Sequence, residues 1–399
     1  MSAVTDNLQL EARKDLVSAR RIVVKVGTHT VTGGATGFNV SRMRPLVRSL
    51  AKLHEAGRQV VLVTSGAVGL GAAKLDVNRV RLQNLVMRQA CAAAGQSLLM
   101  NAYEQLFGEF EVPIGQILVT EADFSNWQRY SSLRRTLEKL LKLRVMPIVN
   151  ENDTVSTAEL EYLDIASSKR IFSDNDRLAA LITVKLEADA LIMLTNVDGL
   201  MRWPSEVTDT GMSDSILIDL VTEISSDLKM LARGHSLSGC GGMVTKLEAA
   251  EIAMRSGSVA VIANGGEADI LERVFTGRPT GTLFTPQARL KGKRRWIAHA
   301  AEVRGRVTVN QGALEALVKG KASLLTSGVI KVEGDFQTKD VVRIIDSEGR
   351  ELARGLINFG KRETEELIQL ASQNKSDRLQ VLVTRNNIVL RSDNNEDGK

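Results

Sequence analysis

The order of hydrophobic and polar positions along the chain predicts strands and helices in alternation. Residues 21–28 begin with an apolar run and reach a glycine turn, which is typical of a buried strand. Residues 39–57 carry apolar side chains at helical spacing and end in a glycine. Residues 59–64 form a second apolar run. A strand, a helix and a strand in such close succession form a βαβ unit, so the pattern predicts a parallel sheet.

The same alternation continues to about residue 284 and predicts an α/β fold, a mostly parallel sheet sandwiched by helices. Pro147 lies inside one of the predicted strands, where it removes a backbone hydrogen-bond donor. The pattern places further strands at 114–120, 145–149, 190–194 and 258–263, a short edge strand at 281–284, and helices at 79–110, 123–143, 177–186 and 245–256.

From residue 286 onward the pattern changes. A basic stretch at 289–295 is followed by short strands separated by turns, which indicates a second, β-rich domain. We therefore predict a first domain at 18–285, a basic linker at 286–302 and a second domain at 303–390. Within the second domain the pattern predicts strands at 306–309, 328–332, 341–345, 351–357 and 379–384, a hairpin turn at 346–349 and one helix at 312–319.

The composition of the chain excludes some classes of protein. With 399 residues, 43% of them hydrophobic, the chain is long enough for two cores. Its two cysteines, Cys91 and Cys240, fit a reducing compartment, and the first twenty residues are not typical of a signal peptide, so a cytoplasmic location is expected. The four histidines are scattered without metal-ligand spacing, and Ser65 has no histidine near it in sequence, so a hydrolase triad is unsupported.

Candidate chemistry lies mainly at the carboxyl ends of predicted strands. Lys25 interrupts an apolar run, where burying it is costly unless an anion meets it. The alternative is a lysine at a strand edge that reaches water. Residues 64–71 contain Ser65, Gly66 and two further glycines, which suit a loop that approaches a ligand closely. That signal is weak alone, because such a loop can also be a flexible connection.

Two polar stretches follow. Residues 150–157 after the fourth strand have side chains that can almost all form hydrogen bonds, although Asn and Asp also serve in turns and caps. Asp174, Asn175 and Asp176 precede the helix 177–186, and a single N-cap explains only one of the two carboxylates.

The most specific phosphate signal is the glycine-rich stretch 238–246, which leads into the helix 245–256. A helix amino terminus offers free N–H groups and a positive dipole end, and Lys246 is predicted in its first turn. The chain contains no Walker loop and no Gly-x-Gly-x-x-Gly. Two lysines, several carboxylates and amide-rich loops suit phosphoryl transfer. A carboxylate acceptor needs no general base, which fits the shortage of histidine.

These motifs together resemble the glutamate 5-kinases of the amino acid kinase family. The resemblance runs in order from about residue 20 to 284, and the tail 303–390 resembles a PUA domain. It is carried by Lys-Val-Gly-Thr at 25–28, Thr-Ser-Gly-Ala at 64–67, Asn-Glu-Asn-Asp at 150–153, Asp-Asn-Asp at 174–176 and Gly-Gly-Met-x-Thr-Lys at 241–246.

The resemblance implies ATP-dependent phosphorylation of the γ-carboxylate of L-glutamate, which opens proline biosynthesis, with Mg²⁺ carried by ATP and no metal site in the protein itself. It implies that Lys25 and Lys246 hold the ATP phosphates. It also implies that Asp176, together with Asp174, orients the two lysines or Mg²⁺. It implies a glutamate site formed by Ser65, Gly66, Asn150, Asp153 and Asn175, and an ATP site formed by Lys25, Thr195, Asn196, Cys240, Gly241, Gly242, Met243, Val244, Thr245 and Lys246.

The chain departs from the family pattern on the nucleotide side and the rim. The segment 158–173 is long, and Ser173, Asn196 and Cys240 replace residues that are common in the family. The expected partners are glutamate, ATP, proline as inhibitor, a second copy of the chain and a transient glutamyl phosphate reductase, with no membrane. One alternative is another acyl-phosphate-forming kinase. The other is RNA binding by the PUA domain, with phosphate contacts from the basic stretch 289–295. For that basic stretch, a solvated linker is the preferred interpretation.

Overall fold

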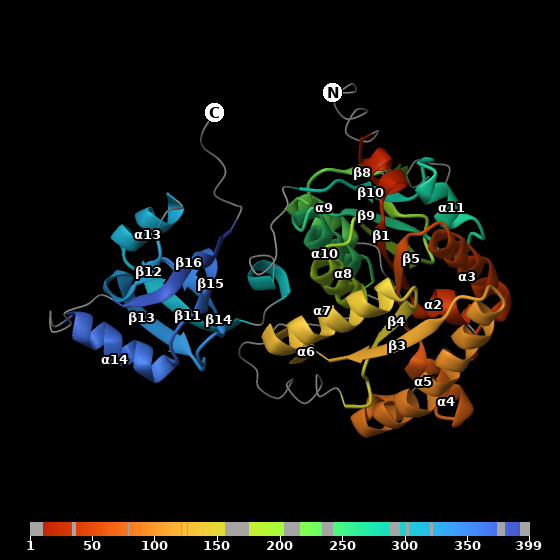
Figure 1. Ribbon diagram of the computed structural model, residues 1–399, viewed down its shortest axis with the longest axis horizontal. Coiled ribbons are helices and arrows are strands. Elements are labelled where there is room, and N and C mark those ends of the chain that lie inside the picture. Colours follow the sequence, from red (N-terminus) through yellow and green to blue (C-terminus); the bar gives the residue numbers. More distant parts are fainter. Residues whose placement is uncertain are drawn as a thin grey trace, which may run out of the picture. The chain divides into compact units, whose positions relative to one another are not determined.

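A computed structural model of the chain consists of two units, which are described separately (Figure 1). The first is formed by Met1–Asp123 and Ser131–Arg289, and the second by Phe124–Tyr130 and Leu290–Lys399. The structure describes residues 11–33, 37–78, 80–120, 122–125, 127–155, 175–202, 216–233, 242–287, 296–300, 303–319, 322–372 and 380–391.

The first unit is organised around an eight-stranded sheet in the order β3-β4-β2-β1-β5-β9-β10-β8. β1 (Arg21–Val26) lies inside it, parallel to β2 (Gln59–Val63) and to β5 (Ala190–Thr195). The mostly parallel sheet predicted from sequence is confirmed. The other strands are β3 (Ile114–Val119), β4 (Met146–Glu151), β8 (Leu220–Val221), β9 (Val259–Asn264) and β10 (Thr282–Phe284), and a separate pair is formed by β6 (Leu200–Arg202) and β7 (Ile216–Ile218).

Alternate side chains of β1 point to opposite faces of the sheet, and helices cover both faces. Ile22, Val24 and Val26 pack into one core with Met43 of α3 (Val40–Glu55) and Leu99 of α5 (Leu85–Gly108). α8 (Asn175–Leu186) packs on β1 and is buried from its second residue nearly throughout its length. The remaining helices are α2 (Thr28–Thr32), α4 (Ala67–Lys74), η1 (Arg81–Gln83), α6 (Ala122–Ser125), α7 (Trp127–Lys142), α9 (Ser226–Arg233), α10 (Gly242–Arg255) and α11 (Ile270–Phe275).

Three predictions about local structure are corrected. The predicted edge strand is β10, which lies between β9 and β8, so β8 forms that edge. Most of the predicted glycine loop is helix α4, which begins directly after Gly66. Helices α8 and α10 begin two and three residues earlier than predicted, because their polar and glycine-rich starts lack the apolar periodicity on which the prediction depended. Lys246 is therefore one turn inside α10 rather than at its start.

The second unit contains a six-stranded sheet in the order β12-β16-β15-β14-β11-β13 around its own apolar core. Its strands are β11 (Val303–Val309), β12 (Leu324–Leu325), β13 (Val329–Gly334), β14 (Val341–Ile345), β15 (Glu351–Ile357) and β16 (Val381–Leu390). The predicted hairpin joins β14 and β15, and Gly349 adopts a φ of 82° that favours glycine there. Besides α13 (Gln311–Val318) and the short η4 (Thr326–Gly328), the unit contains α14 (Lys361–Ser372), which the sequence analysis missed.

Trp296 anchors a buried turn in the second unit. Its side chain is 1% exposed, and its indole N–H donates to the Phe124 carbonyl oxygen at 3.0 Å. Its ring centroid lies 6.0 Å from that of Tyr130. This turn, Trp296–Ala300, falls inside the predicted linker, whereas the basic stretch 289–295 lies outside the described residues. The predicted domain limits stay a prediction.

Candidate active site

The carboxyl ends of neighbouring parallel strands meet at one edge of the large sheet, where ligands bind in open α/β sheets. Lys25 lies near the end of β1, Ser65 follows the end of β2, Asn150 lies near the end of β4 and Thr195 ends β5. Since β4, β2, β1 and β5 are adjacent in the sheet, the fold gathers residues that are far apart in sequence.

Asp176 lies between the two predicted lysines. Its Oδ1 is 2.7 Å from Lys25 Nζ, and its Oδ2 is 2.9 Å from Lys246 Nζ. The Thr245 hydroxyl also donates to Oδ2 at 3.2 Å, and Lys246 donates to the Gly242 carbonyl oxygen at 3.0 Å. Asp176 is 0% exposed, which places one carboxylate between two cations away from water.

The charges of this group do not cancel. Burial by itself raises the pKa of Asp176, but Lys25 and Lys246 outweigh that effect and lower the pKa below its usual value. The carboxylate is therefore ionised, and the three side chains carry one excess positive charge. An excess charge in a nearly buried site is costly unless an anion balances it. This arrangement fits a phosphate group that lies against both lysines.

A second group consists of side-chain amides. The Asn175 amide nitrogen donates to the Thr64 carbonyl oxygen at 2.9 Å, to Ser65 Oγ at 2.9 Å and to Asn150 Oδ1 at 3.1 Å. The Asn150 amide nitrogen in turn donates to Gln96 Oε1 at 3.0 Å. We call Gln96, Asn150 and Asn175 the amide chain.

The direction of the amide chain follows from one atom. The Thr64 carbonyl oxygen can only accept, so Asn175 must turn its nitrogen toward it. Asn150 then presents its oxygen to Asn175 and its nitrogen to Gln96, which accepts. Asn175 Oδ1 and Gln96 Nε2 are left without a hydrogen-bond partner within the part of the chain that the structure describes. The amide chain therefore has one acceptor of fixed direction, Asn175 Oδ1, at one end and one donor of fixed direction, Gln96 Nε2, at the other.

Asp153 lies just after β4, the strand that contains Asn150, and contributes a carboxylate rather than an amide. It lies in the turn after β4 and is partly buried. Burial raises the pKa of Asp153, and the Arg88 guanidinium opposes part of that rise. Arg88 lies on α5, like Gln96, so this helix places two side chains near the predicted glutamate residues.

The glycines after β2 have separate roles. Gly66 adopts a φ of 104° at the start of α4, a conformation that costs other residues strain. Gly71 serves packing, because a Cβ there would lie 1.8 Å from the Cys91 carbonyl oxygen of α5. Gly71 therefore has a packing role, and the position of Gly66 beside a ligand stays a prediction.

The predicted nucleotide residues are only partly described. Thr195 and Asn196 lie at the end of β5, where the Thr195 hydroxyl donates to Asn196 Oδ1 at 3.3 Å. Gly242, Met243, Val244 and Thr245 form the first turn of α10. Ser173, Asp174, Cys240, Gly241 and the segment 158–173 lie outside the described residues.

Comparison with known protein families shows the family to which the chain belongs. The family model described as amino acid kinase family matches residues 20–264. The chain belongs to the amino acid kinase family. The model of the PUA domain matches residues 305–375. Both results confirm what the sequence motifs predicted.

Curated relatives cover nearly the whole chain. The glutamate 5-kinase of Caldanaerobacter subterraneus subsp. tengcongensis is 42% identical over 349 residues, which are 87% of this chain and 90% of that protein. That of Moorella thermoacetica is 42% identical over 351 residues, 88% of this chain and 89% of that protein. That of Desulfotalea psychrophila is 37% identical and covers 96% of this chain and 100% of its own. The predicted resemblance to the glutamate 5-kinases and the prediction of a kinase are confirmed.

Other findings bear on the remaining expectations. None of the described helices is both long and apolar enough to cross a membrane. The described residues also contain no group of three or more His, Cys, Asp and Glu side chains that could hold a metal ion. The cytoplasmic location stays a prediction.

Gln96 of this amino acid kinase was not predicted from the sequence as a site residue. The residue lies within a helix, away from any strand end, so no motif drew attention to it. A signal exists nevertheless: Gln96 follows the small residues 91–95 on a helix face that packs against α4, and it is 8% exposed. A buried amide on such a face needs hydrogen-bond partners, which indicates a polar neighbour.

Proposed function

We propose that this chain transfers the γ-phosphoryl group of ATP to the γ-carboxylate of L-glutamate and forms L-glutamyl 5-phosphate, the first step of proline biosynthesis. The relatives named above are glutamate 5-kinases and match most of the chain. One observation carries the proposal: the first turn of α8 holds Asp176 between Lys25 and Lys246 and, one residue earlier, holds Asn175 in the amide chain. A phosphate site and an amino acid site therefore adjoin.

The lysines supply the charge for the transfer. The phosphoryl group carries negative charge on its oxygens throughout the reaction, and Lys25 and Lys246 neutralise it from both sides of Asp176. Mg²⁺ would enter with ATP and would neutralise part of the charge on its phosphates, beside the charge that Lys25 and Lys246 supply. Asp176 keeps the lysines apart and oriented, because each of its oxygens faces one of them. The acceptor carboxylate is ionised at neutral pH, so the site needs no general base.

The amide chain and Asp153 select the acceptor. Among the described residues Asn175 Oδ1 has no hydrogen-bond partner, and an acceptor of fixed direction suits the ammonium group of a free amino acid. Asp153 adds negative charge for the same group. An acetylated amino group has no positive charge and fewer hydrogens to donate, so the same residues reject it.

Trapping the acyl phosphate with hydroxylamine tests this proposal. We expect hydroxamate to form with L-glutamate and ATP, and much less with N-acetylglutamate or aspartate. Equal turnover of N-acetylglutamate contradicts the role of the amide chain, and the absence of hydroxamate with every carboxylic acid contradicts the reaction type.

We further propose that proline competes at the glutamate site. Proline also carries an α-carboxylate and a positively charged nitrogen, a secondary ammonium, so the amide chain and Asp153 suit it as well. An Asp153→Asn variant should therefore bind glutamate more weakly and lose proline inhibition to a similar extent. Unchanged proline inhibition in a variant with weakened glutamate binding shows a separate site.

A further inference from the structure

Arginines occupy adjacent positions on three neighbouring strands of the second unit. Arg306 of β11 is in register with Arg343 of β14, and Arg343 is in register with Arg354 of β15. Side chains in register on adjacent strands lie on the same face of the sheet, and like charges there destabilise the sheet. We call Arg306, Arg343 and Arg354 the arginine row.

The carboxylates nearby do not balance the row. Glu351 is shared, since Arg354 Nε lies 2.9 Å and Arg343 Nε lies 3.4 Å from its oxygens. Glu333 is in register with Arg306 on its other side, but the carboxylate contacts Lys331 at 3.2 Å. One shared carboxylate therefore serves two guanidinium groups, and positive charge remains.

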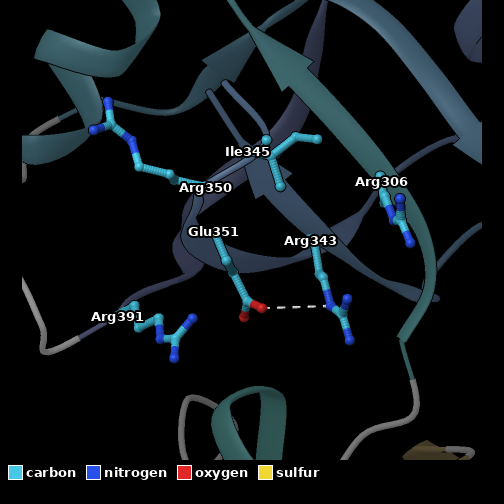
Figure 2. A pocket seen from close by; sticks show the side chains of 7 residues that line it. Arg306, Arg343, Ile345, Arg350, Glu351 and Arg391 are labelled. Atoms are coloured by element: carbon cyan, nitrogen blue, oxygen red, sulfur yellow. Dashed lines mark ion pairs between the residues drawn. The ribbon is translucent and has the colours of Figure 1, made fainter. Parts of the chain in front are cut away.

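Two members of the row, Arg306 and Arg343, line a cavity of about 590 Å³. Figure 2 shows Arg306 and Arg343 with their guanidinium groups pointing the same way, Glu351 beside Arg343, and Arg391 beyond Glu351. Arg350 points away from this group in the same view and pairs with Asp346 at 2.7 Å and Glu348 at 3.1 Å. The cavity is lined by Arg306, Arg343, Ile345, Gly349, Arg350, Glu351 and Arg391.

We propose that this cavity binds a small, multiply charged phosphate compound, a function separate from the kinase reaction. Guanidinium groups present planar pairs of donors that match phosphate oxygens. Strands lie about 4.8 Å apart, so Arg306 and Arg343, on adjacent strands, can both reach the oxygens of one compact phosphate compound. The cavity volume lies in the range of small-molecule sites, about 300–1,000 Å³.

The geometry favours a compact ligand over a nucleic acid backbone. Nucleic acid sites follow the backbone along a positively charged groove and commonly place aromatic side chains for base stacking. Here the charges converge on one cavity, and the residues that line it include no aromatic side chain. The proposal therefore commits to a free phosphate compound, and binding of RNA through the same residues is an outcome that contradicts it.

Calorimetric titration of the full chain with sodium tripolyphosphate tests the proposal. The double variant Arg306→Gln/Arg343→Gln should bind tripolyphosphate at least tenfold more weakly through this site. Arg362→Gln, an exposed arginine of α14 outside the cavity, is the matched control and should bind as the unaltered chain does. The lysines near Asp176 are unchanged in all three proteins, so the difference reports the cavity alone.

Four further measurements make the test more specific. Arg306→Lys keeps the charge but loses the planar donor pair, so we expect intermediate affinity. Tricarballylate should bind more weakly than tripolyphosphate, and a twelve-nucleotide RNA should bind weakly and equally to all variants. Without ligand, the double variant should melt at the same or a higher temperature, because a like-charge contact is removed.

Some results overturn the proposal. Equal tripolyphosphate binding by the unaltered chain and the double variant shows that the cavity is not a phosphate site. Tight RNA binding that the double variant loses assigns the arginines to a nucleic acid surface instead. A melting temperature several degrees lower in the double variant shows that the arginine row serves folding rather than a ligand.

Discussion

Asn175 and Asp176 are neighbours in the first turn of α8, but each belongs to a different group of side chains, and the two groups are held in different ways. Asp176 is held by charge, between Lys25 and Lys246. Asn175, one residue earlier, is held by directional hydrogen bonds in the amide chain that leads through Asn150 to Gln96. The first group neutralises a phosphate, and the second fixes which atoms face the amino acid.

The difference explains why the two groups need different surroundings. The attraction between charges depends on distance and medium, so a lysine can shift slightly and still act on a phosphate. A hydrogen bond weakens steeply with angle, and an amide that rotates by half a turn exchanges its donor and its acceptor. The amide chain therefore depends on an atom that cannot reverse, the Thr64 carbonyl oxygen.

The largest expected effect concerns the charged group. Lys246→Ala removes a cation that matters most when charge develops on the transferred oxygens, so kcat should fall by about a hundredfold or more. Lys25→Ala should behave alike. Lys52→Ala, which removes an exposed lysine paired with Glu272, is the control and should leave kcat unchanged. Steady-state kinetics measures all three, and near-normal kcat in either active-site variant shows a structural lysine.

The next effect concerns the amide chain. Gln96→Leu removes the acceptor for the Asn150 amide nitrogen, so Asn150 loses a buried hydrogen bond and is held less firmly against Asn175. The KM for glutamate should rise about tenfold, since losing a buried hydrogen bond costs about 1–3 kcal/mol. The KM for ATP should stay unchanged.

Two variants make this test specific. Gln96→Glu keeps an acceptor for the Asn150 amide but loses the Nε2 donor, so its KM for glutamate should rise less than that of Gln96→Leu. Gln105→Leu, an exposed glutamine on the same helix, should have no effect. Equal changes in both KM values for Gln96→Leu contradict a positioning role and indicate a general loss of structure.

A smaller effect is expected from pH. Asp153 has a raised pKa because it is buried, so it takes up a proton at a higher pH than an ordinary aspartate, whose pKa is about 3.9. The negative charge that favours the ammonium group is present above the raised pKa and lost below it. The KM for glutamate should therefore rise by a few-fold as pH falls toward that pKa. Asp153→Asn should have a high KM and lose this dependence on pH; if its profile matches that of the unaltered chain, another group titrates.

The smallest effect on activity is expected from removing the carboxyl-terminal part of the second unit, because both groups lie in the first unit. A chain that ends after Ala300 keeps Trp296 with its hydrogen bond to Phe124, and a chain that ends after Arg289 loses it. Both should retain kcat within a few-fold. The shorter chain should melt at a lower temperature, because without Trp296 the side chains that pack on it, such as Tyr130, become exposed. Kinetics and thermal melts measure this, and a folded but inactive shorter chain shows that the second unit contributes to catalysis.

The sequence by itself determined the central elements of the fold. The runs that form β1, α3 and β2 have strong apolar periods, and their limits were predicted to within two residues. Lys25 stood out because a charge inside an apolar strand is costly. Helix α14 was missed because its charged residues leave only a few apolar positions, Leu367 and Ile368 among them, to pack on the core.

Only the tertiary structure decided how the site residues meet. Asp176 lies 70 positions before Lys246 in the chain, and Gln96 lies 54 positions before Asn150. Periodicity reports which face of an element is buried, but it carries no information about which distant side chain lies opposite. The sheet order places β4, β2, β1 and β5 side by side, and that order brings Asp176 to both lysines and the amides into one chain. The direction of the amide chain then depends on a backbone carbonyl, which the sequence does not specify because every residue has one.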